Sequence, residues 1–142
     1  MTHAISWFEI PTTEFDRAVD FYATVLDSEI SEYSPEDGDD YDHETYGRAA
    51  TFPVEEGEVG GMLVEIDEFT SDSGETIHYA PASESGIVVY LSVDGDLDDA
   101  LARVESAGGE VVVPTQSLEE MEGHWAMIVD SEGNRVGLMS TE

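Results

Sequence analysis

Residues 5–27 read ISWFEIPTTEFDRAVDFYATVLD, and this stretch decides the fold because a strand, a turn and an amphipathic helix follow one another in it. Ile5–Ile10 is apolar and rich in β-forming residues, with Glu9 as its single charge, so it predicts a buried strand. Pro11 is expected to end this strand, since proline has no N–H to donate to a neighbour. Side chains alternate along a strand, so Trp7 and Glu9 are expected on one face.

A helix is predicted directly after this strand. Thr12 or Thr13 can cap it, because a threonine hydroxyl accepts hydrogen bonds from the free N–H groups of a first helical turn. The apolar residues after Glu14 recur every three or four positions, which places them on one face of a helix that packs onto a core. They are Phe15, Ala18, Val19, Tyr22, Val25 and Leu26.

The composition indicates one folded domain of moderate size. The chain has 142 residues, 40% of them hydrophobic, which is enough for a substantial core. Cysteine is absent, so disulfides, thiolate metal ligands and cysteine nucleophiles are excluded. The sequence shows no apolar run that could cross a membrane and no leader, so we expect a cytoplasmic protein with no membrane partner.

The charge is the most unusual property of the chain. Thirty-four acidic residues stand against four basic ones, all arginine, and give a net charge of −30. At about 1 M salt the Debye length falls to about 3 Å, which screens the repulsion between surface charges. The acidic residues are dispersed, which favours a halophilic protein over a cation-binding acidic cluster. Nucleic acid is not expected as a partner, because phosphate binding needs a density of lysine and arginine that this chain lacks.

The chain repeats itself once. Each half reads as a strand, a helix and three further strands, and the halves end alike, in Gly61-Met62-Leu63 and in Gly137-Leu138-Met139. Two βαβββ modules that pair edge to edge predict an α+β fold with a curved mixed sheet around a concave cavity and both helices outside. We expect a single domain over residues 1–142, with the first module at about 1–68, a linker at 69–86 and the second module at about 87–142.

The remaining elements are predicted from apolar runs bounded by turn residues. In the first half the expected strands are Ser28–Ser34, Arg48–Val54 and Val59–Ile66, and the acidic stretch Pro35–Glu44 is interpreted as a solvated loop. In the second half they are Ile87–Val93, Glu110–Val113 stopped by Pro114, Trp125–Val129 and Arg135–Ser140. A second helix, capped by Asp94 or Asp96, is expected to end at Gly108-Gly109.

Three segments carry a resemblance to a known family. They are WFEIPTTEFDRAVDFYATVLD from Trp7, VVYLSVDGDLDDALARVESAGGEVV from Val88 and DSEGNRVGLMS from Asp130. With the βαβββ duplication, they resemble the vicinal oxygen chelate superfamily, and within it the glyoxalase-like branch. That superfamily includes glyoxalase I, fosfomycin-resistance enzymes, extradiol dioxygenases and bleomycin-resistance proteins. The resemblance implies a small-molecule cavity and a homodimer.

The metal enzymes of this family hold a divalent ion with histidine, glutamate or glutamine from the first and last strand of each module. Carried over by position, those places here are Trp7, Gly61, Val88 and Gly137. None of these side chains offers a lone pair to a metal. The resemblance therefore implies a cavity, and the residues at these places predict that it holds no metal and no other cofactor.

The hairpin near the C-terminus sets which side chains share that cavity. A three-residue loop, Ser131–Gly133 with glycine in the left-handed position, fits the sequence best and pairs Met127 with Gly137 and Trp125 with Met139. If the resemblance fixes the facing, an aromatic and thioether lining surrounds one carboxylate and suits a flat or apolar small molecule. The predicted lining is Trp7, Glu9, Val88, Tyr90, Trp125, Met127 and Met139. The alternative is that the tryptophans and methionines only pack.

Two charged residues are candidates for chemistry in the cavity. Glu9, with aromatic neighbours, is expected to lose hydration and to act as a general base that takes a proton next to a carbonyl. Arg48 begins a strand that should border the cavity, where it can balance Glu9 or bind an anionic ligand; a surface ion pair is the alternative. The histidines match no ligand motif and are interpreted as structural or surface residues. They are His3, His43, His78 and His124.

Three functions compete at this point. The first is a metal-independent lyase or isomerase of the glyoxalase type that uses Glu9. The second is a non-catalytic protein that sequesters a small molecule, as bleomycin-resistance proteins do. The third is a metal enzyme with displaced ligands, for instance Glu9 with His78 or His124, and it ranks last because displaced sets rarely fall at metal–ligand distances.

We predict that the protein unfolds when salt is removed, because about thirty uncompensated negative charges then repel one another across a small surface. The measurement is a series of thermal melts from low to molar potassium chloride. The melting temperature should rise steeply with salt. A melting temperature that is the same at all concentrations would contradict the prediction.

Overall fold

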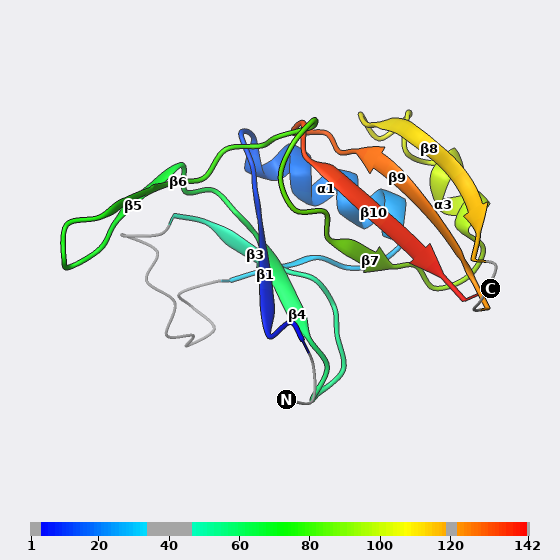
Figure 1. Ribbon diagram of the computed structural model, residues 1–142, viewed down its shortest axis with the longest axis horizontal. Helices are drawn as coiled ribbons and strands as arrows, with labels where there is room; N and C mark the ends of the chain where they lie inside the picture. The colour runs from blue at the N-terminus through cyan, green and yellow to red at the C-terminus, as the bar shows by residue number, and fades with distance from the viewer. Residues whose placement is uncertain (1–3, 34–46, 119–121, 142) are drawn as a thin grey trace.

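The computed structural model describes residues 4–33, 47–118 and 122–141 (Figure 1). The predicted loop Pro35–Glu44, His3 and His43 lie outside the described residues. Within the described ranges, no helix has both the length and the apolar character needed to span a bilayer.

The first sheet has the strand order β1-β4-β3-β2. Its edge strand β1 (Trp7–Pro11) runs parallel to β4 (Gly60–Val64), and the other pairs are antiparallel. β3 (Ala49–Thr51) and β2 (Ser31–Glu32) complete the sheet. Helix α1 (Phe15–Leu26) connects β1 to β2.

The second sheet repeats this arrangement in the order β7-β10-β9-β8. Its strands are β7 (Tyr90–Ser92), β8 (Glu110–Ser117), β9 (His124–Val129) and β10 (Arg135–Ser140), with β7 parallel to β10. Helix α3 (Leu97–Ala102) connects β7 to β8. In Figure 1 both helices lie behind the strands. The α+β class with two strand-rich modules is confirmed, and the strands form two four-stranded sheets.

The segment between the modules has more structure than the sequence predicts. β5 (Glu68–Thr70) and β6 (Thr76–His78) pair antiparallel, mostly within the predicted linker at 69–86, and project from one end of the molecule in Figure 1. Each strand has three residues, which is too short for an alternating pattern to be recognised. Polar Ser and Gly residues fill the turn between them, so the stretch reads as a linker.

Two prolines lie inside strands that they are predicted to end. Pro11 is the last residue of β1, and Pro114 lies within β8, which continues to Ser117. Both strands are sheet edges, where a missing N–H costs no ladder hydrogen bond. β8 also shifts register between Val113 and Gln116, as expected where a bulge accommodates a proline.

Helix α3 begins as predicted and ends early. The Asp98 N–H donates to Asp96 Oδ1 at 2.7 Å, so Asp96 is the cap. The helix ends at Ala102, and a series of turns follows before Gly108, whose φ is +106°. The apolar face continues through Val104, which is fully buried, so the spacing predicts a longer helix than the chain forms.

The larger of two clusters of buried residues runs through both modules and fixes the facing of the strands; the smaller cluster, Ala49, Met62 and Val64, lies on the other face of the first sheet. Tyr22 and Val25 of α1 belong to the larger cluster together with Leu63 of the first sheet and Leu138 of the second. Along each strand the residues between the core positions lie on the opposite surface. We call that surface, which faces away from the helices, the open face of each sheet.

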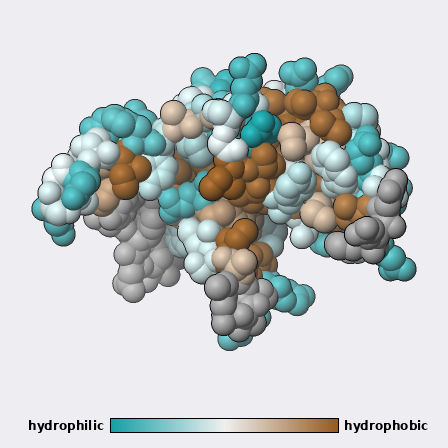
Figure 2. Space-filling model, viewed as in Figure 1, coloured by the Kyte–Doolittle hydropathy of each residue, from teal (hydrophilic) through white to brown (hydrophobic). Residues whose placement is uncertain are grey.

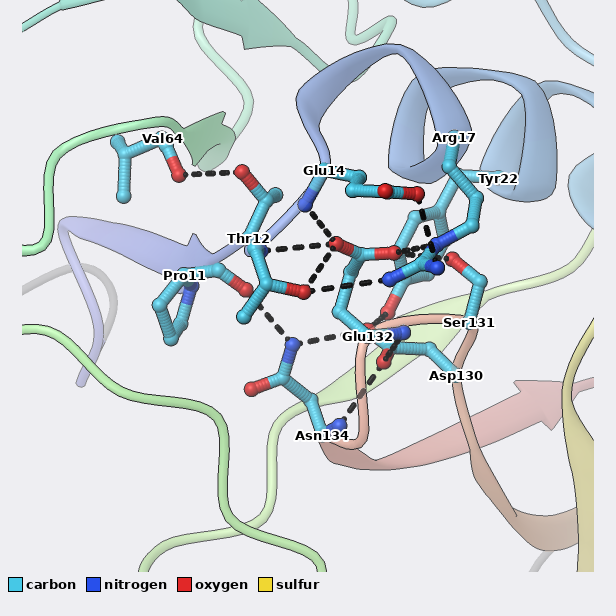
Figure 3. Close-up of polar contacts among 11 residues, drawn as sticks. Pro11, Thr12, Glu14, Arg17, Tyr22, Val64, Asp130, Ser131, Glu132 and Asn134 are labelled. Carbon is cyan, nitrogen blue, oxygen red and sulfur yellow. Dashed lines mark hydrogen bonds and ion pairs between the residues drawn. The ribbon is translucent and has the colours of Figure 1, made fainter.

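The start of α1 is held by a residue from the other module. The N-cap is Glu14, which makes no side-chain cap, and neither predicted threonine side chain accepts a hydrogen bond from a backbone N–H of the helix. The Thr12 hydroxyl instead donates to the Val64 carbonyl at 2.9 Å. The acceptor is Glu132, whose Oε1 takes hydrogen bonds from the Thr13 N–H at 2.8 Å and the Glu14 N–H at 2.5 Å (Figure 3).

Further polar contacts join the turn Asp130–Asn134 to the first module. Arg17 Nε donates to Glu132 Oε2 at 2.7 Å, and the buried Tyr22 hydroxyl donates to Asp130 Oδ2 at 2.6 Å. Asn134 Nδ2 donates to the Pro11 carbonyl at 2.8 Å. Burial and the adjacent Asp130 carboxylate raise the pKa of Tyr22, so its hydroxyl remains a donor. The turn has the predicted three-residue loop, and Gly133 has a φ of +94°.

We predict that Glu132→Gln lowers the free energy of unfolding by about 2 kcal/mol at neutral pH, because charge-assisted hydrogen bonds are lost. Burial raises the pKa of Glu132, but hydrogen bonds from Arg17 and the two backbone N–H groups outweigh it and lower the pKa from 4.5 to about 2. The contribution is therefore complete above about pH 4.5 and is lost as the pH falls towards 2.

Denaturant unfolding in molar potassium chloride, measured from pH 7 to pH 3, tests this. Glu110→Gln is the matched control, because it removes one exposed carboxylate from strand β8 without touching the network. The gap between the Glu132 variant and wild type should narrow in acid. A gap that is absent at pH 7, or that does not change with pH, would contradict the assignment.

Candidate functional site

The open face of the second sheet carries two rows of side chains across three strands. The first row joins Tyr90 on β7, Gly137 on β10 and Met127 on β9. The second row joins Ser92, Met139 and Trp125 on the same strands. The predicted pairings of Met127 with Gly137 and of Trp125 with Met139 are both confirmed.

An aromatic ring covers a glycine on the open face of each sheet. Tyr90 lies so close over Gly137 that a side chain there would collide with the ring. In the first sheet Trp7 covers Gly60, where a Cβ atom would approach the indole to 3.3 Å. The pairs Trp7–Gly60 and Tyr90–Gly137 occupy the same place in the two parallel strand pairs.

This equivalence corrects two positions carried over from the resemblance. Gly61 faces the helix side, where the ring of Phe8 covers it, so Gly60 is the open-face glycine of the first module. Val88 precedes β7, and Tyr90 is the counterpart of Trp7. The repeated sequence Gly-Met-Leu against Gly-Leu-Met is misleading here, because a shift of one residue reverses the facing of a strand.

The predicted cavity lining is divided among several hollows. Trp7 lines one of about 310 Å³, Tyr90 one of about 230 Å³, and Glu9 one of about 210 Å³. Tyr90 and Trp125 pack edge to face with ring centroids 6.4 Å apart. Trp125 and the two open-face methionines, Met127 and Met139, are half-buried on β9 and β10.

Glu9 lies on the open face as predicted, but its surroundings differ from the expectation. Its neighbour across the parallel pair is Met62, and its side chain is exposed. The aromatic residues that were expected to exclude water from the Glu9 carboxylate line other cavities. Instead it faces the segment 80–87 and Arg135 across the cavity of about 210 Å³.

Arg48 does not reach Glu9, because it points to the helix side. Its Nε donates to Glu32 Oε1 at 2.5 Å, its Nη2 donates to Asp16 Oδ1 at 2.8 Å, and its guanidinium lies 4.6 Å from the centre of the Phe15 ring. The hydrogen bond and charge of Arg48 lower the pKa of Asp16. The alternative of a surface ion pair is therefore the one that the structure supports.

The histidines of the displaced-ligand hypothesis lie apart from Glu9. His78 is on β6, where its Nδ1 is 3.5 Å from Glu68 Oε2, and His124 begins β9. Among the described residues, no group of three or more histidines, aspartates and glutamates is arranged to hold a metal ion.

Sequence reasoning missed the role of Arg135. It lies on the open face of β10, two residues before Gly137, and lines the same cavity as Glu9. The pattern that indicates its position is the alternation along β10, which puts Arg135 on the same face as Gly137 and Met139.

The comparisons with known proteins agree with this geometry. The model of the Glyoxalase/Bleomycin resistance protein/Dioxygenase superfamily matches residues 4–138. The chain belongs to this superfamily. No curated protein sequence matches it.

Solved structures share the fold at low sequence identity. A glyoxalase-related enzyme from Fulvimarina pelagi has a TM-score of 0.65 and 11% identity over 97% of this chain and 88% of its own. TnmS3, an antibiotic binding protein from Streptomyces sp. CB03234, has a TM-score of 0.56 and 21% identity over 99% and 97%. Glyoxalase I from Zea mays has a TM-score of 0.59 and 17% identity over 96% of this chain and 45% of its own.

The residues of this superfamily member do not fit the metal that metal-dependent relatives hold. With the facing corrected, the equivalent positions are Trp7, Gly60, Tyr90 and Gly137. An indole and two glycines offer no donor, and the Tyr90 ring lies against Gly137. We therefore derive no step through a metal at these positions.

We predict that no divalent metal binds at these four positions. The protein, purified in molar potassium chloride without chelator, should carry well under one Ni²⁺, Zn²⁺ or Mn²⁺ per chain by elemental analysis. His78→Ala and His124→Ala should leave the metal content unchanged. About one tightly held ion per chain, coordinated by protein on an open face, would contradict the prediction.

Proposed function

We propose that this protein binds a flat, apolar small molecule on its open face and does so without a metal. The observation that carries the proposal is the Tyr90–Trp125 pair, which packs edge to face beside a glycine and keeps aromatic surface accessible. Trp7 and Tyr90 are each 43% exposed, which is unusual for large rings inside a sheet. Figure 2 shows hydrophobic residues gathered at the centre of the viewed face.

The physical basis is stacking on rings that are already held in place. Tyr90 cannot collapse further onto the sheet, because Gly137 already lets it lie against the backbone. A rigid ring loses little conformational entropy when a planar ligand covers it. Met127 and Met139 add flexible, polarizable contacts that adapt to different ligand shapes.

Binding is better supported than catalysis by Glu9. A general base that works near neutral pH needs a desolvated or specifically paired carboxylate, and Glu9 is exposed on the described surface. The similarity in fold to an antibiotic binding protein agrees with a binding role, while the similarity to glyoxalase I leaves the catalytic alternative. Turnover separates them: a catalytic protein should convert a bound compound and lose that turnover in Glu9→Gln, whereas a binding protein should bind it stoichiometrically without converting it.

We also propose a homodimer. The sheets end in edge strands, and large apolar residues remain exposed near them, with Ile87 94% exposed in the segment before β7. A second copy that covers the open faces would remove this surface from water and enclose the ligand. Light scattering in molar potassium chloride should give twice the monomer mass of 15.5 kDa; a monomer at micromolar concentration would contradict it. From the net charge of −30 we also propose that the protein works in a cytoplasm that contains molar salt.

We predict that planar aromatic compounds quench the intrinsic tryptophan fluorescence of the protein. The chain has two tryptophans, Trp7 and Trp125, and both lie on open faces, so the signal reports on the proposed site directly. For the compound that binds best, Tyr90→Ala should weaken binding about tenfold, because aromatic contacts contribute about 1 kcal/mol beyond the buried area.

Ile77→Ala is the matched control, since it removes a 51% exposed apolar side chain from the β5–β6 hairpin. It should leave affinity unchanged. If no compound in a broad panel of planar aromatics quenches the fluorescence, or if Tyr90→Ala and Ile77→Ala behave alike, the proposal fails.

A further inference from the structure

A cavity of about 210 Å³ that the proposed function does not use lies between β1, the segment 80–87 and the start of β10. One wall is the end of β1 with Glu9, and the opposite wall is the start of β10 with Arg135. The segment 80–87 crosses between them and is fixed to β10, because the Arg135 N–H donates to the Ala82 carbonyl at 3.1 Å. This backbone hydrogen bond holds the segment against the start of β10.

The Arg135 guanidinium is incompletely bonded. Its Nη2 donates to the Gly86 carbonyl at 3.1 Å, while its Nε is buried without a hydrogen-bond partner. Among the described residues, no carboxylate lies within ion-pair distance of it. A buried, charged donor without a partner is costly, and native structures normally satisfy such a group with protein, water or a ligand.

The other three arginines show how unusual this is. Arg17 pairs with Glu132, and Arg48 pairs with Glu32. Arg103 donates to the Thr24 and Val25 carbonyls in the last turn of α1. The chain has 34 acidic residues, yet Arg135 forms no ion pair with any of those that the structure describes.

The opposite wall adds a second requirement. Glu9 presents an exposed carboxylate to the same cavity, and it lies beyond 4 Å from the guanidinium, because the two form no ion pair. A cavity with a fixed cation on one side and a fixed anion on the other matches a ligand that carries both charges. The remaining lining is mainly aliphatic: Ile10, Pro11, Ala82, Ile87, Val89 and Val136.

We propose that this cavity binds a small aliphatic α-amino acid, with its carboxylate on Arg135, its ammonium group on Glu9 and its side chain against the aliphatic wall. A guanidinium binds a carboxylate through its N–H donors, and here the ligand carboxylate meets the outer Nη groups of Arg135, since the Nε atom is buried. The aliphatic residues of the lining suit the side chain of such a molecule.

Isothermal titration calorimetry of the full chain in molar potassium chloride tests the proposal with three probes. L-valine carries both charges, 3-methylbutanoate lacks the ammonium group, and 2-methylpropan-1-amine lacks the carboxylate. We expect saturable binding of valine with one molecule per chain. Each single-charge probe should bind at least about tenfold more weakly, as the loss of one charged hydrogen-bonded contact predicts.

Variants test the two residues separately. Arg135→Gln and Glu9→Gln should each weaken valine binding about tenfold or more, and Arg135→Lys should fall between wild type and Arg135→Gln. Arg48→Gln is the matched control, because it removes the same charge from the helix side and should stay within about twofold.

The comparison of the three probes on the wild-type protein tests the proposal even if a variant does not fold. Absence of saturable valine binding would overturn the proposal. Equal affinity for valine and 3-methylbutanoate would also overturn it, since the cavity would then be a simple anion site. Unchanged valine affinity in folded Arg135→Gln would place the amino acid elsewhere.

Discussion

The structure depends on one buried carboxylate. Glu132 belongs to the second module, yet its two oxygens accept the first N–H groups before α1 and the guanidinium of Arg17. A carboxylate at a helix N-terminus is favoured by the helix dipole as well as by these hydrogen bonds. It fixes α1 against the turn Asp130–Asn134, and α1 in turn packs on both sheets, so the relative position of the two open faces follows from this contact.

The site follows from two parallel strand pairs that this arrangement presents. In each pair an aromatic residue lies over a glycine, Trp7 over Gly60 and Tyr90 over Gly137. The glycines remove the positions from which metal-dependent members of the superfamily reach a metal, and they give the rings a flat support. The glycine beneath each ring therefore accounts both for the lack of metal donors and for the exposed aromatic surface. A binding role without a metal is consistent with this arrangement.

Most of the fold could be predicted from local sequence patterns, and the exceptions have physical reasons. The helix face of α1, the hairpin register and the Asp96 cap depend on residues near one another in the chain, so the sequence reveals them. The cap of α1 comes from Glu132, 118 residues after Glu14, and no local pattern shows it. The facing of Gly61 depends on a strand register that a one-residue shift reverses. For Arg48 the sequence left the cavity and a surface ion pair open, and the structure shows the ion pair; Arg135 was left unassigned.

The most direct test is a crystal structure of the protein purified from its native source, or refolded with a cell extract, in molar potassium chloride. The account predicts electron density for a planar organic molecule against Tyr90 and Trp125, with no metal ion between the two sheets. Mass spectrometry of the released molecule would identify it. Density for a metal ion coordinated on an open face, or a ligand that contacts neither ring, would contradict the account.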